Sequence, residues 1–389
     1  MTPKLRVLVF SGCYLPGFRA GGPISSLVNL VNALGADVDF RIVTLDTDVG
    51  SDTPYPTVAS GVWQTVEGVE VLYLSRAAVS IRRLITEIHD QAPQMIYLNG
   101  FFEPVFTIRL MVARRLGLIR HIPMLLAPRG DCSPGALSLK RVKKSVYIRL
   151  ARVAGLYRNL SWQASSELER QDIMRVMTAV TPGRVCVAPM LTADPAALPS
   201  REARPADGVL RLCFLSRISP IKNLDFALRV LATVQVPVTF TIYGPVEAPA
   251  YWAECQALMA RLPGRIQVTY AGEVPSVEVR RTLARQELLF LPSRGESFGH
   301  VIHEALSAGV PVLTSDQTPW TDLEAHGAGW SLPLHSMTAF QHIIEAASRL
   351  SSQERAAQSG RTMAYATTRA NRPAAIRQTF ELFTRVAGA

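Results

Sequence analysis

The stretch SRGESFGHVIHEALSAGVPVLTSD, residues 293–316, decides the fold. It follows LLFLP (Leu288 to Pro292), a short apolar run typical of a buried parallel strand. The spacing predicts a helix from about His300 to Ala308, which Gly309 ends, and residues 310–314 predict another buried strand. A strand, a polar turn, a helix and a strand in this order indicate a parallel α/β sheet.

The turn before this helix has the features of a ligand site. Gly299 lets the backbone approach a ligand closely, and the free N–H groups at a helix start attract an anion. Glu296 lies in the turn, and Glu304 lies one helical turn beyond His300, on the same face. The two carboxylates could accept hydrogen bonds from sugar or ribose hydroxyls while the helix start holds a phosphate.

Glu296 and Glu304, with the residues between them, resemble the E-x7-E segment of the retaining family 4 glycosyltransferases, part of the glycosyl transferases group 1. SRISPIKN, residues 216–223, resembles the segment that precedes it in that family. The resemblance is close over residues 210–334 and loose over the first half. It implies the GT-B fold, an α/β architecture of two Rossmann-like domains facing each other across a donor cleft.

The resemblance also implies roles for individual residues. Arg217 and Lys222 would be catalytic by neutralising the leaving diphosphate, although both could be ordinary surface charges. Glu296 would be catalytic by orienting the sugar; whether it attacks is open, because same-face substitution needs no covalent intermediate. The predicted donor-binding residues are Gly21, Gly22, Tyr243, Gly244, Val274, Ser297, Phe298, Gly299 and Glu304.

The first predicted loop is rich in glycine but is not a GxGxxG fingerprint. Gly21 and Gly22 precede Pro23, which suits the first turn of a helix. One reading is a turn that needs glycine for its shape. The other, implied by the resemblance, is that these glycines bring backbone amides to the donor phosphates.

Two further loops follow predicted strands of the first half and are candidates for the acceptor or sugar side. They contain Asn99, and Arg129 with Asp131. Family members often carry a histidine at the second position, and this chain has none there. Arg129 and Asp131 could replace it, face the acceptor, or form a structural salt bridge. His121 lies at the opposite end of that strand and is predicted to be a surface residue.

The chain is long enough for two domains. We predict an N-terminal acceptor-binding domain at 1–190, a nucleotide-sugar-binding domain at 191–370, and a C-terminal helix, 371–389, that packs back on the first domain. Residues 188–208, rich in proline, alanine and charge, read as the linker.

Composition excludes several other classes of protein. At 48% hydrophobic and 19% charged residues the chain is globular, with no apolar run near the roughly 18–20 residues of a membrane span. The first twelve residues read as a strand, so a cytoplasmic location is expected. The five single cysteines indicate neither disulfides nor a zinc site. His300, His303 and Glu304 do not match a metalloprotease pattern, so no metal and no other cofactor is expected.

Residues 139–158 form a basic amphipathic stretch, and no acidic residue occurs from Cys132 to Ser166. With a net charge of +10, this stretch could lie on an anionic membrane, at the inner face of the plasma membrane. The alternative is a helix packed on the sheet with a solvated basic face. No nucleic-acid-binding motif is found.

The sequence thus predicts a retaining glycosyltransferase that moves a hexosyl unit from a nucleotide diphosphate sugar to a glycan or polyprenyl-linked acceptor, in bacterial surface polysaccharide or glycoconjugate biosynthesis. A non-catalytic GT-B-like protein that binds nucleotide or glycan is the alternative, supported by the missing histidine. A sugar-phosphate enzyme of the phosphorylase type is a third possibility, but this chain has no recognisable pyridoxal-phosphate lysine motif.

Overall fold

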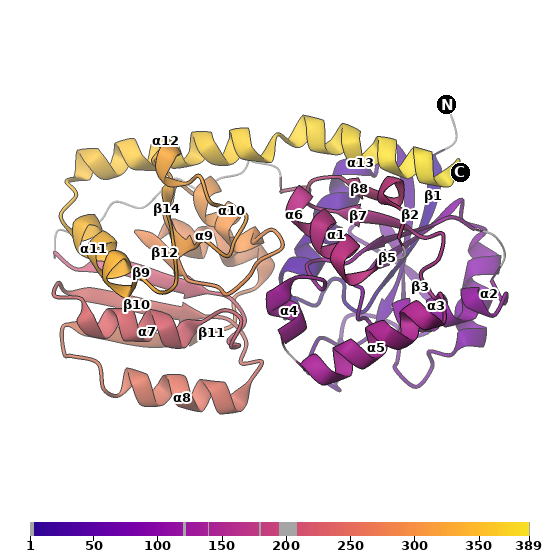
Figure 1. The fold of residues 1–389 in the computed structure, drawn as a ribbon, viewed down its shortest axis with the longest axis horizontal. Helices are drawn as coiled ribbons and strands as arrows, with labels where there is room; N and C mark the ends of the chain where they lie inside the picture. The colour runs from indigo at the N-terminus through magenta and orange to yellow at the C-terminus, as the bar shows by residue number, and fades with distance from the viewer. Residues whose placement is uncertain (1–3, 120–121, 139, 179, 194–207, 389) are drawn as a thin grey trace. The chain divides into compact units, whose positions relative to one another are not determined.

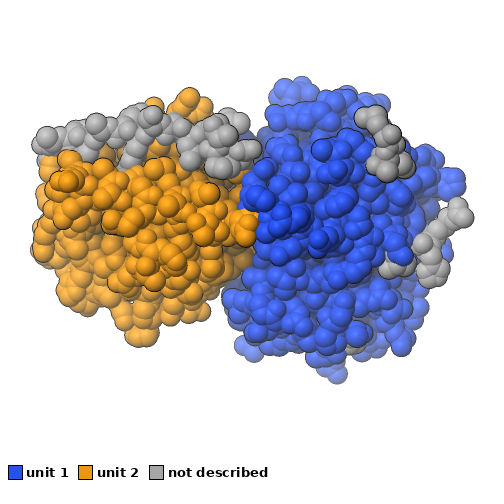
Figure 2. Space-filling model, turned by 90° about the horizontal axis from the view of Figure 1, so that it is seen from above, with its two compact units in different colours: residues 1–191, 372–389 blue, residues 192–371 orange. Residues whose placement is uncertain are grey.

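The structure is a computed structural model that describes residues 4–119, 122–138, 140–178, 180–193 and 208–388. The chain divides into two compact units, shown in different colours in Figure 2. Unit 1 comprises Met1–Leu191 and Arg372–Ala389, and unit 2 comprises Thr192–Asn371. Each division falls one residue beyond the boundary predicted from the sequence. His121, residue 139 and most of the predicted linker, 194–207, lie outside the described residues.

Unit 1 contains an eight-stranded sheet in the order β3-β4-β2-β1-β5-β6-β7-β8 (Figure 1). The strands are β1 (Leu5–Ser11), β2 (Val38–Leu45), β3 (Trp63–Val66), β4 (Val69–Leu74), β5 (Met95–Asn99), β6 (Met124–Ala127), β7 (Ser161–Ala164) and β8 (Val185–Val187). The sequence predicted only parallel strands and missed β3, which pairs antiparallel with β4 at the sheet edge. Glu67 and Gly68 both have positive φ, 48° and 80°, as a tight hairpin turn requires.

Helices cover the sheet of unit 1. They are α1 (Gly22–Leu34), α2 (Ile81–Gln91), α3 (Thr107–Arg115), α4 (Pro134–Ser138), α5 (Arg141–Val153), α6 (Glu167–Val176) and α13 (Arg372–Ala387). The C-terminal α13 belongs to this unit: the Phe383 ring lies 6.2 Å from that of Phe40 and 5.5 Å from that of Tyr97. Asn371, in the left-handed region at φ 33°, separates α13 from the helix before it.

Unit 2 contains a six-stranded, entirely parallel sheet in the order β11-β10-β9-β12-β13-β14. Its strands are β9 (Leu210–Leu215), β10 (Val238–Tyr243), β11 (Ile266–Gly272), β12 (Leu288–Leu291), β13 (Val312–Ser315) and β14 (Gly329–Leu332). All four residues of β12 are buried, as its unbroken apolar sequence predicts for a central parallel strand. The chain order reverses between β9 and β12, and ligands of such sheets bind at this switch point, beyond the carboxyl ends of the strands.

The helices of unit 2 are α7 (Leu224–Thr233), α8 (Pro249–Met259), α9 (Val279–Ala284), α10 (His300–Ser307), α11 (Met337–Ser348) and α12 (Ser352–Ala370). Short 3-10 turns occur in both units, at Pro182–Arg184, Ser276–Glu278 and Glu324–His326. Gly309, at φ 72°, follows α10, and a Cβ there would lie 2.1 Å from the Ser359 hydroxyl oxygen. This close approach explains the glycine that ends the helix. None of the helices in the described ranges combines the length and hydropathy of a membrane-spanning segment.

Candidate functional site

The turn from β12 to α10 has the shape that the sequence predicts. Gly299 is the N-cap residue of α10 at φ 78°, and no side chain caps the helix start. A Cβ at Gly299 would lie 3.0 Å from Cδ1 of Ile302 and 3.4 Å from Nε1 of Trp320. The Trp320 indole also donates a hydrogen bond to the carbonyl of Phe298. The positive φ and the close packing both require glycine, and the helix start is left open for an anion.

Lys222 and Glu296 form the centre of the site. Lys222 lies in the loop after β9, and its Nζ is 2.6 Å from Oε1 of Glu296, in the turn after β12. The Ser293 hydroxyl donates to the same carboxylate oxygen at 2.8 Å. Only 13% of the Lys222 side chain and 9% of the Glu296 side chain are exposed. The structure therefore brings two predicted catalytic residues together at the switch point of the sheet.

Asn223 holds the two loops that carry this ion pair. It is buried, adopts the left-handed conformation at φ 63°, and is the N-cap residue of α7. Its Nδ2 donates to the Pro292 carbonyl at 2.9 Å, and its Oδ1 accepts from Nε of Arg294 at 2.9 Å. The backbone N–H of Arg294 also donates to the Ile221 carbonyl at 2.8 Å. These bonds fix the position of Lys222 relative to Glu296 through the backbone as well as the side chains.

Arg217, the third predicted catalytic residue, has a different partner. Its guanidinium lies 2.7 Å from Oε2 of Glu247, in the loop after β10, and both side chains are at least one-third exposed. Sequence reasoning missed Glu247, because its position relative to Arg217 depends on the pairing of β9 with β10. Exposed ion pairs stabilise a protein by about 1 kcal/mol or less, so a phosphate can displace Glu247 at small cost.

Tyr243 is the last residue of β10, and Gly244 follows it. Both lie at the carboxyl ends of the strands, as Lys222 and Glu296 do. Gly244 has φ 127°, and a Cβ there would lie 2.0 Å from the Ser216 carbonyl oxygen. Its N–H donates to the Gly272 carbonyl at 2.7 Å, which joins the ends of β10 and β11. Val274, just beyond β11, is partly buried against the core of unit 2. The predicted donor-binding residues Tyr243, Gly244 and Val274 thus lie at the ends of neighbouring strands.

Glu304 lies inside α10, and burial raises the pKa of its carboxyl group to about 7, against a lowering by the Arg280 charge. No hydrogen bond to this carboxylate is found among the described residues, so it can accept one from a ligand. Arg280, from α9, was missed by sequence reasoning because its proximity to α10 is tertiary. Ser297 lies between Glu296 and Phe298 in the turn and is partly buried.

His303, on α10, lies in the packed interior of unit 2. His303 is buried beside the rings of Phe298 and Trp320, and burial lowers its pKa to about 4. The imidazole ring is therefore uncharged at pH 7 and contributes to the packing of the interior. In the described part of the chain, no group of three or more His, Cys, Asp and Glu side chains is arranged to hold a metal ion.

Gly21, Gly22 and Asn99 lie at the switch point of unit 1, where the chain order reverses beside β1. Gly21, at φ 60°, is the N-cap residue of α1, and a Cβ there would meet nothing within 4 Å; Gly22 is the first residue of this helix. Asn99, at the end of β5, donates to the Ser11 hydroxyl at 3.2 Å and to the Pro23 carbonyl at 3.4 Å. The glycine loop and Asn99 therefore share one strand edge.

Arg129 and Asp131 do not form the salt bridge considered in the sequence analysis. Nε of Arg129 donates to Oδ1 of Asn99 at 2.8 Å, and its NH2 donates to the Tyr97 hydroxyl at 2.7 Å. Oδ2 of Asp131 instead accepts backbone N–H groups of 101 and 102 at 2.9 and 3.1 Å. Burial raises the Asp131 pKa, and these hydrogen bonds oppose the rise. Arg129 joins Asn99 in one cluster, whereas Asp131 supports a loop.

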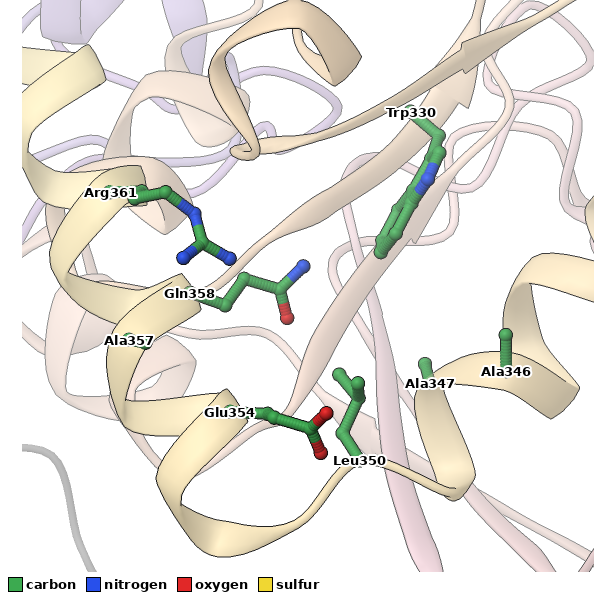
Figure 3. Close-up of a pocket in the computed structure, with 8 residues that line it drawn as sticks. All are labelled: Trp330, Ala346, Ala347, Leu350, Glu354, Ala357, Gln358 and Arg361. Carbon is green, nitrogen blue, oxygen red and sulfur yellow. The ribbon is translucent and has the colours of Figure 1, made fainter.

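A pocket of about 260 Å³ lies elsewhere in unit 2, among α11, α12 and β14 (Figure 3). Trp330 and Gln358 face each other across it, with Arg361 on the same helix as Gln358. Its lining contains none of the predicted donor-binding or catalytic residues.

Comparison with known proteins agrees with the geometry of unit 2. Residues 200–363, which include Arg217, Lys222, Glu296 and Glu304, match the family model described as Glycosyl transferases group 1. The matched segment lies within unit 2 and covers most of it. The D-inositol 3-phosphate glycosyltransferase of Jonesia denitrificans is 31% identical over 148 residues, which are 35% of this chain and 34% of that protein. The match thus spans about a third of the length of this curated relative.

Solved structures resemble the chain over almost its whole length. Anabaena HepE, solved in complex with UDP and glucose, has a TM-score of 0.74 at 17% identity and covers 98% of this chain and 100% of its own. Sucrose-phosphate synthase from Thermosynechococcus elongatus has a TM-score of 0.77 at 16% identity, with coverages of 98% and 99%. At these identities the likeness shows the fold, and the predicted GT-B fold, with one Rossmann-like sheet in each unit, is confirmed.

Proposed function

We propose that this protein is a retaining glycosyltransferase that moves a hexosyl unit from a nucleotide diphosphate sugar to a glycan or lipid-linked acceptor. The observation that carries this proposal is the Lys222–Glu296 ion pair beside the open start of α10. The match of residues 200–363 to the glycosyl transferases group 1 family model, and the likeness to a structure solved with UDP and glucose, support a nucleotide-sugar donor. The pathway we propose is synthesis of a bacterial surface polysaccharide or glycoconjugate.

Lys222 would neutralise the leaving diphosphate. An ammonium group has three donors, so it can bind a phosphate oxygen while it keeps its contact with Glu296. Negative charge on the leaving phosphate increases as the glycosidic bond breaks, and a pre-positioned cation stabilises that charge in the transition state. The start of α10 would add N–H donors, and Arg217 would join after exchanging Glu247 for phosphate.

Glu296 would orient the hexose. Its carboxylate already accepts hydrogen bonds from Lys222 and Ser293, which fix its direction. A sugar hydroxyl that donates to it would place the anomeric carbon near the diphosphate. Glu304, without a hydrogen-bond partner in the described residues, would accept from the ribose hydroxyls. Charge on the diphosphate would then be balanced by Lys222, Arg217 and the helix start, so we propose that turnover needs no metal.

Unit 1 would bind the acceptor, with Asn99 and Arg129 at its switch point as the polar contacts. Arg129 has a guanidinium held by Asn99 and Tyr97. It lies in the loop where the family resemblance noted in the sequence analysis implies a histidine. We propose that this cluster takes over the contact of that histidine with the donor sugar or the acceptor.

The first test is a thermal-shift titration with UDP, GDP, ADP and dTDP, of the natural protein and of Lys222→Ala. We expect one nucleotide to stabilise the natural protein by mass action and to stabilise the variant far less. Turnover of the corresponding nucleotide sugars, with and without EDTA, then separates an enzyme from a binding protein. Stabilisation by none of the four nucleotides would overturn the proposed donor site, and binding without any transfer or hydrolysis would favour the non-catalytic alternative.

A further inference from the structure

Helix α5 (Arg141–Val153) carries its apolar residues on the outside of unit 1. Val142, Val146, Leu150 and Val153 follow one another at spacings of four, four and three residues, so they lie on one face of the helix. All four are exposed, and the exposed fractions of Val142 and Val153 reach 79% and 84%. A helix at the surface of a globular protein usually turns such a face to the core. The helix does pack on unit 1 with a solvated basic face, as the alternative predicts, but these four side chains take no part in that packing.

Specific contacts on the opposite face hold the helix in this orientation. Ala151 is buried, and the Tyr147 ring lies 6.0 Å from Phe101 and 5.9 Å from Phe102. Nζ of Lys144 donates to a backbone carbonyl of α4 at 2.6 Å and lies 4.7 Å from the centre of the Phe102 ring. The aromatic contacts and this lysine fix the inner face, so the four aliphatic side chains must point outward.

The outward face is also cationic. Lys143 and Arg149 lie on either side of the aliphatic residues by helical position, and Arg141 is exposed at the first turn. No ion pair involving these three side chains is found within the described ranges, and the sequence from Cys132 to Ser166 has no acidic residue. The described residues therefore leave the positive charge of this face without an acidic partner.

Two further leucines extend the apolar surface. Leu116 and Leu118, which follow α3, are both more than half exposed. Nε of Arg115 donates to the Ala154 carbonyl at 2.8 Å, which ties the end of α3 to the end of α5. The exposed leucines thus follow directly on a residue that is hydrogen-bonded to the C-terminal end of α5.

We propose that α5 docks unit 1 on a membrane that carries anionic lipids. The four aliphatic side chains would enter the boundary between headgroups and acyl chains, while Lys143 and Arg149 bind lipid phosphates. A helix lies in a membrane interface when an apolar face and flanking basic residues are presented together, and anionic lipids supply the opposite charge. A second copy of this chain fits less well, because two uncompensated basic faces would repel. The proposal deepens the proposed function, since it would bring the enzyme to a lipid-linked acceptor.

The test is flotation of the full chain with vesicles of pure phosphatidylcholine and vesicles containing 30% phosphatidylglycerol, on the order of the anionic content of cell membranes. The apolar variant replaces Val142, Val146, Leu150 and Val153 by serine, and the basic variant replaces Arg141, Lys143 and Arg149 by glutamine. The control variant, Val62→Ser with Leu168→Ser and Arg82→Gln, changes exposed residues of the same unit outside α5.

We expect the natural protein and the control to bind the anionic vesicles and to bind the neutral ones weakly. The basic variant should lose roughly fivefold in partition per removed charge, and the apolar variant about tenfold or more. Equal binding by all variants, equal binding to both vesicles, or no binding by the natural protein would each overturn the proposal. The proposal would also be overturned if the natural protein bound no vesicles and formed a dimer that the apolar variant does not form.

The same variants separate this proposal from the proposed function. Nucleotide stabilisation in solution should be unchanged in the apolar and basic variants, because α5 is not part of the donor site. Vesicle binding without any nucleotide binding would overturn the donor site alone. Nucleotide binding without vesicle binding would overturn the docking proposal alone.

Discussion

Nζ of Lys222 lies 2.6 Å from Oε1 of Glu296, although 74 residues separate them in the chain. Lys222 follows β9 and Glu296 follows β12. These two strands pair with each other, at the point where the chain order of the sheet reverses. The ion pair stands where parallel sheets bind their ligands. The residue that we propose for the leaving group and the one that we propose for the sugar thus form one ion pair, which leads to separate predictions for each.

Lys222→Ala should weaken binding of the donor nucleotide about 10- to 100-fold, which corresponds to roughly 1.5–3 kcal/mol for a charge-assisted hydrogen bond. Isothermal titration calorimetry with the nucleotide found by thermal shift measures this loss. Arg261→Ala, which removes an exposed cation of the same unit, should leave the affinity unchanged. An unaltered dissociation constant in Lys222→Ala would mean that the donor phosphates bind elsewhere.

Glu296→Gln should reduce kcat far more than nucleotide affinity, because the amide keeps the shape of the side chain but loses its charge. A fall of about 100-fold or more in kcat is expected for a group that acts in the transition state. Steady-state kinetics with the nucleotide sugar, alongside nucleotide binding, gives both quantities. Glu254→Gln, an exposed carboxylate on α8, is the matched control. Equal losses in affinity and kcat would assign Glu296 to nucleotide binding.

Glu304 should make nucleotide binding depend on pH. Its carboxyl pKa is raised to about 7, so it ionises between roughly pH 6 and 8, and the ionised form accepts hydrogen bonds better. Affinity should therefore rise with pH through about 7, beyond any change caused by the nucleotide phosphate. Glu304→Gln reports the phosphate contribution by itself. If both proteins show the same pH profile, Glu304 does not contact the ligand.

The same shift predicts a pH dependence of stability. The folded-state pKa lies above the unfolded value of 4.5, so the folded protein binds more protons in this window. The contribution of Glu304 to stability is full below about pH 4.5 and is lost as pH rises through about 7. The free energy of unfolding of the natural protein, relative to Glu304→Gln, should fall by roughly 1–3 kcal/mol between these values. Urea denaturation at pH 4.5, 6 and 7.5 measures it, and a constant difference would contradict the burial of this carboxylate.

Gly299→Ala should destabilise unit 2 and disturb the start of α10. The substitution places a Cβ at φ 78° and 3.0 Å from Ile302, so both strain and crowding oppose it. Gly272→Ala is the control, because it has the same φ of 78° but open space around its Cβ. We expect a cost of about 1 kcal/mol for the control and about 1–3 kcal/mol more for Gly299→Ala, from denaturant unfolding. Equal costs would show that the neighbours of Gly299 adjust freely.

Several features of the site could be predicted from the sequence because they are local. Gly299 before a helix, and a buried strand before Glu296, follow from φ preferences and from apolar runs over a few residues. The edge strand β3 was missed, since it is only four residues long and its hairpin turn, Glu67-Gly68, lacks the Asn-Gly or Asp-Gly signal. The partner of Arg217 could not be predicted, because Glu247 reaches it only through the pairing of β9 with β10.

By itself, the sequence determined the alternation of strands and helices, the glycine turn before α10 and the acidic residues Glu296 and Glu304 that flank it. Only the tertiary structure decided that Lys222 pairs with Glu296, that Arg129 binds Asn99 and that burial raises the Glu304 pKa. It also decided the direction of α5. Helical periodicity tells which residues share a face, but which face turns inward depends on the contacts that Ala151 and Tyr147 make with distant parts of the chain.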